Sequence, residues 1–250
     1  MAMIEEFEVS AERGIPIVVV AGARLILDTG SPVSFARTGN ITLGGCGYQV
    51  PVDCRAGNPN SLSQFLGEPV DGLLGCDLLA SRILDLNCPA GRAHVISDDA
   101  SPEMPCWLAN AIPLPVSMTM GVPIAQISVN GRQASAAVDT GASVCFASPH
   151  LLEGTHPIGR HDDFHPGIGR FTTALHLASI HLGNEEYSVC LPVAAAPASM
   201  LPLLAGLRLA VILGGDLVTG AETLFDFRSG SGVVLLSSPK HVRRAQGQTT

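Results

Sequence analysis

The chain has 250 residues, of which 46% are hydrophobic and 14% are charged, and its formal net charge is −8. A chain of this length buries enough surface to fold without a metal or disulfide staple, and its 27 glycines and 18 prolines are typical of strands joined by turns. The negative charge argues against a nucleic-acid partner, because contact with a phosphate backbone calls for a basic face.

The N-terminal residues and the cysteines favour a cytoplasmic location. Glu5 and Glu6 lie where a signal peptide needs a basic segment and an apolar run, so we expect no export signal. The 7 cysteines form no Cys-x-x-Cys pair, which favours free thiols over a disulfide framework. The weakly charged segment 192–215 is interrupted by prolines, so we expect neither a membrane span nor a membrane partner.

In chain order, the first predicted elements are a hairpin that leads into an Asp-Thr-Gly sequence. A β-branched run that starts at Gly14 is followed by a turn at Ala21-Gly22 and by the apolar strand Leu25-Ile-Leu27. Asp28-Thr-Gly30 comes directly after this strand, and glycine is the residue that tolerates the sharp turn required there. The pattern predicts that Asp28 lies at the end of a buried strand.

Three further elements complete the first half of the chain. The segments Ile41-Thr-Leu-Gly44 and Tyr48-Gln-Val50 come next, followed by Leu73-Leu-Gly-Cys-Asp-Leu78, in which we expect Asp77 to cap a helix. The sequence Ile83-Leu-Asp-Leu86 runs into a glycine-containing turn and an apolar return strand. This last pattern predicts a closing hairpin.

The second half of the chain repeats these elements in the same order. An Asn-Gly turn and an apolar strand precede Asp139-Thr-Gly141, which lies 111 positions after the first Asp-Thr-Gly. Residues 41–78 align with residues 180–217 without a gap at an offset of 139. An internal repeat of this kind predicts two similar structural units.

The second unit carries an insertion. The offset between the copies rises from 111 to 139 between Phe146 and Ile180, so 28 additional residues lie at roughly 152–179. The segment alternates in polarity and contains Gly167, Ile168 and Gly169, which predicts a β-hairpin with a glycine tip. Because it follows the second Asp-Thr-Gly loop, we expect this hairpin to act as a flap that binds substrate.

These boundaries divide the chain into four parts. Residues 1–98 form the first unit, which has no flap, and residues 99–118 form a polar, proline-rich linker. Residues 119–238 form the second unit with its flap, and residues 239–250 form a flexible tail without an apolar pattern.

The two Asp-Thr-Gly sequences, each followed by a hydrophobic-Gly pair, resemble those of the pepsin and retropepsin type of aspartic peptidase. The resemblance implies an all-β, bilobal fold of two pseudo-symmetric β-barrel lobes, each with a short helix and with a single flap in the C-terminal lobe. It also implies that Asp28 and Asp139 are the catalytic pair. The supporting residues of the two loops would be Thr29, Gly30, Ser31, Thr140, Gly141 and Ala142. The hydrophobic-Gly strands beneath the loops would carry Leu74, Gly75, Leu213 and Gly214.

The sequence departs from both branches of this family. Retropepsins usually have an acidic residue two places after the loop glycine, where this chain has Pro32 and Ser143. Pepsins have a flap with a tyrosine in the N-terminal lobe, whereas here the flap lies in the second half and no tyrosine occurs between residues 146 and 180. The chain is similar to a fused, tandem retropepsin that has lost one flap.

The resemblance predicts an aspartic endopeptidase that activates a water between the two aspartates. In this chemistry, repulsion keeps one carboxyl protonated and the other ionised. A hydrogen bond from Ser31 to Asp28 would make Asp139 the protonated partner. The alternative is a catalytically weak peptide-binding or scaffold protein on the same fold.

The expected partner is a polypeptide in extended conformation, and we expect no cofactor. The spacing of His156, His161 and His165 does not place three ligands on one face of a hairpin, so we expect pH-sensitive flap histidines and no metal. The chain could be a monomer or could self-associate.

Overall fold

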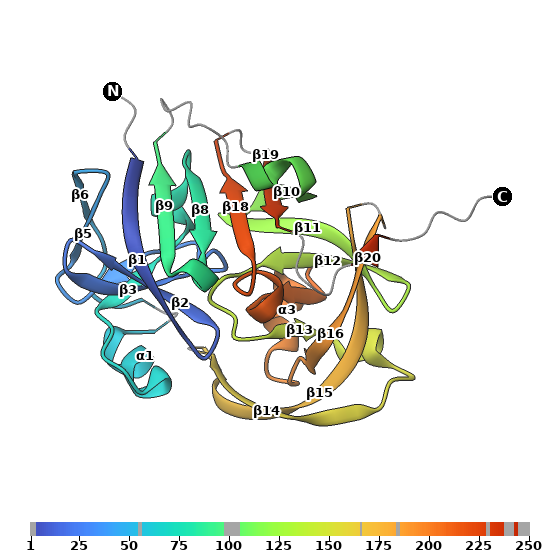
Figure 1. The fold of residues 1–250 in the computed structure, drawn as a ribbon. Helices are drawn as coiled ribbons and strands as arrows, with labels where there is room; N and C mark the ends of the chain where they lie inside the picture. The colour runs from blue at the N-terminus through green and yellow to red at the C-terminus, as the bar shows by residue number, and fades with distance from the viewer. Residues whose placement is uncertain are drawn as a thin grey trace.

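The computed structural model describes residues 4–54, 57–97, 106–165, 167–183, 186–228, 231–237 and 243–244. These residues are mostly β-strand with few short helices, as predicted. Figure 1 shows the two halves of the chain as two lobes that meet along a shared group of strands.

The first lobe follows the predicted order of elements and contains two short helices and one short 3-10 turn. Its elements are β1 (Ile4–Glu12), β2 (Ile15–Val20), β3 (Ala23–Leu27), β4 (Phe35–Ala36), β5 (Asn40–Leu43), β6 (Cys46–Gln49), α1 (Pro59–Leu66), β7 (Gly72–Leu74), α2 (Cys76–Leu79), β8 (Ile83–Asn87), η1 (Cys88–Ala90) and β9 (Arg92–Ile96).

The second lobe repeats this order and adds the long hairpin of β14 and β15. Its elements are η2 (Cys106–Asn110), β10 (Ile112–Thr119), β11 (Val122–Val129), β12 (Arg132–Val138), β13 (Cys145–Ala147), η3 (Pro149–Leu152), β14 (Pro157–His165), β15 (Gly169–Leu182), β16 (Tyr187–Ala195), α3 (Leu201–Gly206), β17 (Val211–Leu213), η4 (Gly215–Leu217), β18 (Glu222–Asp226), β19 (Ser231–Leu236) and β20 (Arg243–Arg244).

In each lobe, the strand that ends in the aspartate lies parallel to the strand that carries the hydrophobic-Gly pair. Leu27 is the register partner of Leu74 in the pair β3–β7, and Val138 is the partner of Leu213 in the pair β12–β17. All four side chains are buried. Strands that are apolar on both faces suit the centre of a parallel pair, which explains the continuous apolar runs in the sequence.

A single sheet joins the lobes in the order β1, β9, β8, β18, β19, β10. Its central pair is antiparallel and brings Leu84 of the first lobe opposite Phe225 of the second. Both side chains are fully buried, and the Phe225 ring stacks on Phe227 with 5.7 Å between the ring centroids. The lobes therefore share one hydrophobic core.

Helix α1 is held at both ends by the residues around it. The Asn58 side chain accepts hydrogen bonds from the backbone N–H groups of Asn60 and Ser61, and Pro59 occupies the first turn. Gly67, with a φ of 81°, ends the helix. The buried face of α1 places Phe65 in a small apolar cluster of the first lobe.

The segment expected as a linker is shorter than predicted. Residues 112–118 lie in β10, which pairs with β11 and β19 as the counterpart of β1. The strand alternates buried and exposed residues, and its two prolines, at 113 and 115, lie at exposed positions. The predicted flexible tail lies outside the described residues except for β20, which pairs with β16.

Cys46, Cys54, Cys76, Cys88 and Cys190 are free thiols, and Sγ of Cys145 is hydrogen-bonded to the backbone of Gly214. Among the described helices, none has the length and apolar character needed to cross a bilayer.

Replacement of Phe225 by alanine tests whether the interlobe sheet is the common core. We expect the free energy of unfolding to fall by about 3–5 kcal/mol, because the change leaves a cavity where no side chain can collapse inward. Urea unfolding would measure this loss. Leu177→Ala is the matched control, since Leu177 is 49% exposed and a surface change of this kind alters stability by about 0.5 kcal/mol or less.

Candidate active site

The structure brings Asp28 and Asp139 together at the floor of a cavity of about 350 Å³. Each aspartate comes directly after a buried strand, and its backbone N–H donates to the hydrophobic-Gly strand: Asp28 to the carbonyl of Leu74 at 3.0 Å, and Asp139 to that of Leu213 at 2.8 Å. The two carboxyl groups are within hydrogen-bond reach of each other. Residues from the two halves of the chain thus form one site.

The two loops are locked by an exchange of hydrogen bonds between Thr29 and Thr140. The Thr29 hydroxyl donates to the carbonyl of Val138 at 2.8 Å and accepts from the N–H of Thr140 at 3.1 Å. In return, the Thr140 hydroxyl donates to the carbonyl of Leu27 at 2.6 Å and accepts from the N–H of Thr29 at 3.0 Å. Both threonines are fully buried, so all four bonds lie away from water.

The loop glycines are required by the close approach of the opposite carboxyl group. A β-carbon at Gly30 would lie 2.3 Å from Cγ of Asp139, and one at Gly141 would lie 2.5 Å from Cγ of Asp28. The N–H of Gly30 donates to Oδ1 of Asp28, and that of Gly141 donates to Oδ1 of Asp139, each at 2.8 Å. These glycines both make room for the carboxyl groups and orient them.

The glycines of the hydrophobic-Gly strands allow the loops to rest on these strands. A β-carbon at Gly75 would lie 2.8 Å from the carbonyl oxygen of Ser31, and one at Gly214 would lie 2.6 Å from Cβ of Ala142.

The expected hydrogen bond from the Ser31 hydroxyl to Asp28 is not formed. This hydroxyl donates instead to the carbonyl of Val33 at 2.9 Å, because the side chain points along its own loop.

The environment of the pair favours retention of a proton. Burial raises the pKa of Asp28 well above its usual value, and the negative charge of Asp139 raises it further. Burial also raises the pKa of Asp139. Hydrogen bonds from Asp28, Gly141, Gly30 and Ala142 lower this pKa and offset part of the rise. Because the two carboxyl groups titrate together, the proton belongs to the pair, and the prediction that Asp139 is the protonated partner stays a prediction. The pair is suited to share one proton.

Asp77 supports the first loop in a way that the sequence analysis missed. It was predicted to cap a helix, but its carboxylate accepts hydrogen bonds from the N–H of Ser34 at 2.9 Å and from the Ser34 hydroxyl. The Ser34 hydroxyl in turn accepts from the N–H of Gly75 at 2.8 Å. In the second lobe Cys145 replaces Ser34, and its Sγ accepts from the N–H of Gly214. The first loop therefore has a charged anchor at this position.

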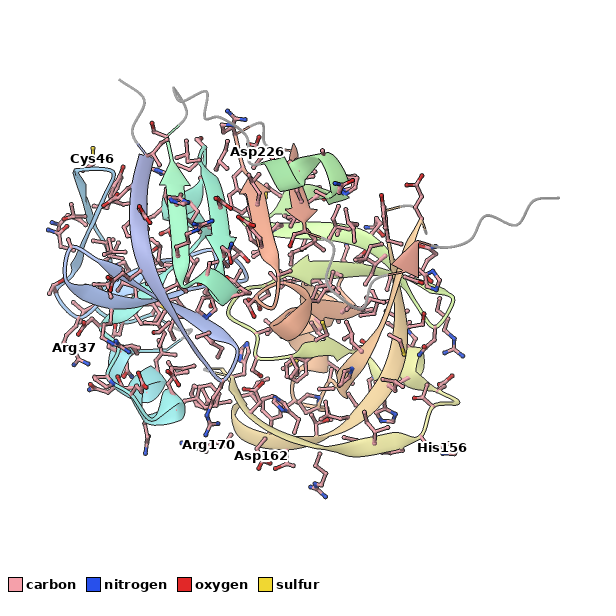
Figure 2. The ribbon with its side chains drawn as sticks, viewed as in Figure 1. Arg37, Cys46, His156, Asp162, Arg170 and Asp226 are labelled. Carbon is pink, nitrogen blue, oxygen red and sulfur yellow. The ribbon has the colours of Figure 1, made fainter. Side chains whose placement is uncertain are left out.

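The predicted flap is present as the hairpin of β14 and β15, which crosses from the second lobe to the first. Near its tip, Phe164 stacks on Phe65 of α1 with 5.2 Å between the ring centroids. The Arg170 guanidinium, labelled in Figure 2, donates to the backbone carbonyl of Gln64 at 3.1 Å. The hairpin is thus held over the cavity by contacts with both lobes.

The cavity wall comes from residues beside the tip of the hairpin. Gly167, Ile168 and Gly169 were predicted to bind substrate, but the flap residues that line the cavity are Asp163, Phe164, His165 and Phe171. Ile168 instead packs against the apolar cluster of the second lobe. The residues that flank the tip therefore supply the hairpin's side of the cavity, while Ile168 packs on the second-lobe cluster beside it.

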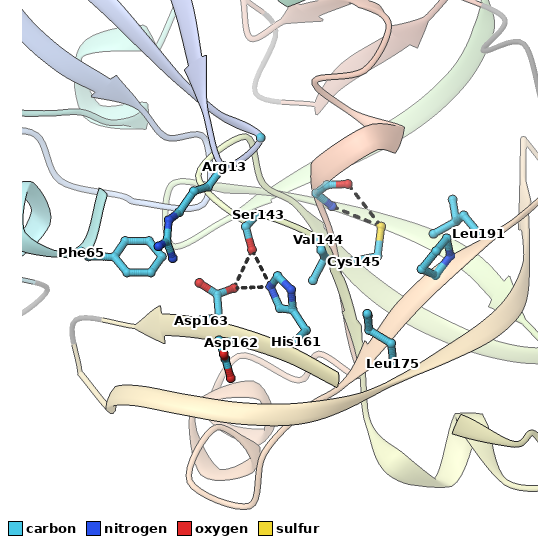
Figure 3. A pocket seen from close by; sticks show the side chains of 13 residues that line it. Arg13, Phe65, Ser143, Val144, Cys145, His161, Asp162, Asp163, Leu175 and Leu191 are labelled. Carbon is cyan, nitrogen blue, oxygen red and sulfur yellow. Dashed lines mark hydrogen bonds and ion pairs between the residues drawn. The ribbon is translucent and has the colours of Figure 1, made fainter. Parts of the chain in front are cut away.

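A polar cluster ties the hairpin to the second loop, as Figure 3 shows. The Ser143 hydroxyl lies 2.6 Å from Oδ2 of Asp163 and 3.0 Å from Nε2 of His161. The same Nε2 atom lies 3.3 Å from Oδ2 of Asp163. A Ser-His-Asp relay would need the two ring nitrogens to face different partners, so this cluster is a structural tie.

The three histidines whose spacing was considered for a metal site lie in different surroundings. His156 is exposed, His161 belongs to the tie with Ser143, and Nδ1 of His165 accepts from the N–H of Gly167 at 3.1 Å. Within the part of the chain that the structure describes, no group of three or more His, Cys, Asp or Glu side chains is arranged to hold a metal ion.

Thr29→Val tests the lock between the loops. Valine keeps the shape of threonine but leaves the N–H of Thr140 and the carbonyl of Val138 buried without their partner. We expect the free energy of unfolding to fall by roughly 2–6 kcal/mol. Thr42→Val, at an exposed position of β5, should change it by about 0.5 kcal/mol or less. Equal losses in the two variants, measured by urea unfolding, would contradict the lock.

The raised pKa of Asp28 predicts a specific pH dependence of stability. The folded chain holds this proton more tightly than the unfolded chain, so the contribution of Asp28 is fully present below the ordinary Asp pKa of about 4 and is lost as pH rises through the folded-state pKa. Asp28→Asn should therefore unfold near the wild-type temperature at low pH and above it at neutral pH.

Asp226→Asn is the control for this experiment, because its effect on stability should depend on pH in the opposite direction. Hydrogen bonds from Arg228 lower the pKa of Asp226, so its ionised form stabilises the fold above its unfolded pKa. The asparagine variant should be less stable than the wild type at neutral pH, with the difference vanishing on acidification. If the stability of both variants, relative to the wild type, changed with pH in the same direction, the pKa of Asp28 would not be raised in the folded protein.

Comparison with solved structures finds a similar architecture in basic 7S globulin from soybean. The match has a TM-score of 0.52 at 10% sequence identity and covers 95% of this chain and 95% of that chain. No protein-family model matches the sequence, and no curated protein matches it. A likeness at this identity establishes the fold alone. The chain therefore has the pepsin-like bilobal fold.

Proposed function

We propose that this protein is an aspartic endopeptidase in which Asp28 and Asp139 activate water to hydrolyse a peptide bond. The observation that carries the proposal is the pair of closely placed carboxyl groups, one from each repeat, that line the cavity beneath the hairpin. Their raised pKa values keep one proton on the pair over the range in which the other carboxyl is ionised. General acid and general base are then present in one site.

In the first step, the ionised carboxylate takes a proton from a water that attacks the carbonyl carbon of the peptide bond. The protonated carboxyl donates its proton to the carbonyl oxygen, which gives a neutral tetrahedral intermediate. In the collapse of this intermediate, the carboxylate formed in the first step takes a proton from a hydroxyl group as the C=O bond re-forms. The other carboxyl passes the proton that it took from water to the leaving nitrogen as the C–N bond breaks. The pair returns to its starting state without a covalent intermediate and without a cofactor.

The proposed substrate is a polypeptide in extended conformation. The walls of the cavity are largely apolar and include Met120, Val122, Phe146 and Leu207, so they suit apolar side chains. The hairpin covers the carboxyl groups and presents backbone to which an extended peptide can add as a further strand. Exclusion of water in this way strengthens the electrostatic interactions that stabilise the intermediate.

The alternative is a peptide-binding protein that hydrolyses slowly or not at all. One observation favours it: the hairpin tip is packed on the first lobe through Phe164 and Arg170, so entry of a substrate requires these contacts to open. The name of the matched soybean protein describes a globulin and no enzyme. On this alternative the same cavity would hold a peptide without cleavage.

Cleavage of a peptide library between about pH 3 and pH 8 separates the two proposals. For the enzyme, Asp28→Asn and Asp139→Asn should each lower kcat/KM by about 10²–10⁴-fold or more, and a statine-type inhibitor should block the wild type. Asp53→Asn is the matched control, because Asp53 is an exposed aspartate of the first lobe. Absence of cleavage by a folded wild type, together with peptide binding, would establish the binding protein instead.

A further inference from the structure

Each lobe contains a small apolar cluster beside the carboxyl pair, and the repeat relates the two clusters. Residues that occupy equivalent positions in the repeats are buried in both. The first-lobe cluster contains Ile15, Phe35 and Phe65, and the equivalent second-lobe residues are Val122, Phe146 and Leu204. The cleft therefore has two potential pockets for side chains of a peptide, one in each lobe.

The first-lobe cluster is closed by the flap. Phe164 packs against it and stacks on Phe65, and the guanidinium of Arg13 lies 5.2 Å from the centroid of the Phe65 ring. The hydrogen bond from Arg170 to the carbonyl of Gln64 holds the same end of the hairpin in place. Asp163, one residue before Phe164, bonds Ser143 of the second lobe. Alternation along β14 thus directs these two neighbours to different lobes.

The second-lobe pocket faces the cavity, although Ile168, Phe171 and Leu175 of the hairpin also pack against its cluster. Its wall includes Met200, Leu203 and Leu207, all of which line the cavity above the carboxyl pair. Leu203 is 43% exposed although it is a large apolar residue beside a cavity. Phe171 of the hairpin covers one side of this pocket by an edge contact with Phe146 at 6.1 Å.

The repeat shows that the two pockets differ in chemistry as well as in access. The first-lobe equivalents of Met200, Leu203 and Leu207 are the polar residues Ser61, Gln64 and Glu68, at the constant offset of 139. At these three positions the second-lobe pocket therefore has an apolar rim, while the rim of the cluster that Phe164 covers is polar.

We propose that Phe164 occupies the place of a substrate side chain in the first lobe, so that the cleft accepts one large apolar residue next to the scissile bond. This proposal rests on the proposed function and concerns its substrate. Successive side chains of an extended peptide point to opposite sides, so the two residues that flank the scissile bond face different lobes. The residue facing the second lobe is large and apolar, and the residue facing the first lobe is small.

The first test compares cleavage sites in a peptide library for the wild type and Phe164→Ala. For the wild type, large apolar residues should be enriched on one side of the scissile bond only. Phe164→Ala should admit them on both sides, with kcat/KM for peptides that carry two such residues rising by about 10-fold or more. Phe164→Leu should give an intermediate change in the cleavage pattern. Because leucine keeps more of the apolar side chain, this variant should retain the fold even if the alanine variant does not.

Two further variants act as controls. Ile158→Ala changes an exposed residue of β14 outside the described contacts of the hairpin tip, and it should leave the cleavage pattern as in the wild type. Leu203→Gln gives the second-lobe pocket the residue that stands at the equivalent position of the first lobe. It should weaken the preference for a large apolar residue on the second-lobe side and leave the other side unchanged.

A binding experiment keeps this inference separate from the proposed function. Asp28→Asn, which removes one of the two carboxyl groups, would be titrated with short peptides that carry one or two large apolar residues around a central bond. The double variant Asp28→Asn/Phe164→Ala should gain about 10-fold or more in affinity for the two-residue peptides relative to Asp28→Asn. Such a gain supports the role of Phe164 whether or not the wild type cleaves.

The outcomes therefore distinguish the two ideas. No cleavage by the wild type, with the expected gain in binding, would overturn the endopeptidase and keep the assignment of Phe164. Cleavage by the wild type with the same side-chain pattern and the same peptide affinities in the Phe164→Ala variants would overturn the role of Phe164 and keep the endopeptidase.

Discussion

The exchange of hydrogen bonds between Thr29 and Thr140 is the interaction on which the site depends. It joins two loops from different lobes by four bonds that lie away from water. The loops carry carboxyl groups that repel each other when both are ionised, and burial adds to this cost, as the raised pKa values of Asp28 and Asp139 indicate. The hydrogen bonds between the threonines and the shared interlobe core together offset the free-energy cost of burying two carboxyl groups side by side.

The repeat explains the symmetry of the molecule, and its insertion explains where that symmetry ends. Both lobes deliver an aspartate from a buried strand that runs beside a hydrophobic-Gly strand. Only the second lobe carries the hairpin, but the hairpin serves both lobes, since Phe164 packs on the first and Phe171 on the second. A single flap can therefore cover a cleft that is built from two equivalent halves.

Differences around the pair make two chemically identical carboxyl groups unequal. The first loop is anchored through Ser34 to the carboxylate of Asp77, whereas Cys145 stands in the place of Ser34 in the second loop. The second loop is also tied to the flap through Ser143. The first loop is thus anchored through Ser34 to a carboxylate of its own lobe, while the second is held both by Gly214 of its own lobe and by the element that covers the cavity.

The sequence by itself determined the two Asp-Thr-Gly loops, the hydrophobic-Gly strands and the inserted hairpin, because apolar runs, glycine turns and repeat offsets follow local rules. It missed the strand at residues 112–119, whose two prolines lie at exposed positions. Only the tertiary structure decided that Phe164 covers the first lobe and that Asp163 meets Ser143. Such contacts depend on the distance between segments far apart in the chain and on the direction in which each side chain points, and no local pattern encodes either.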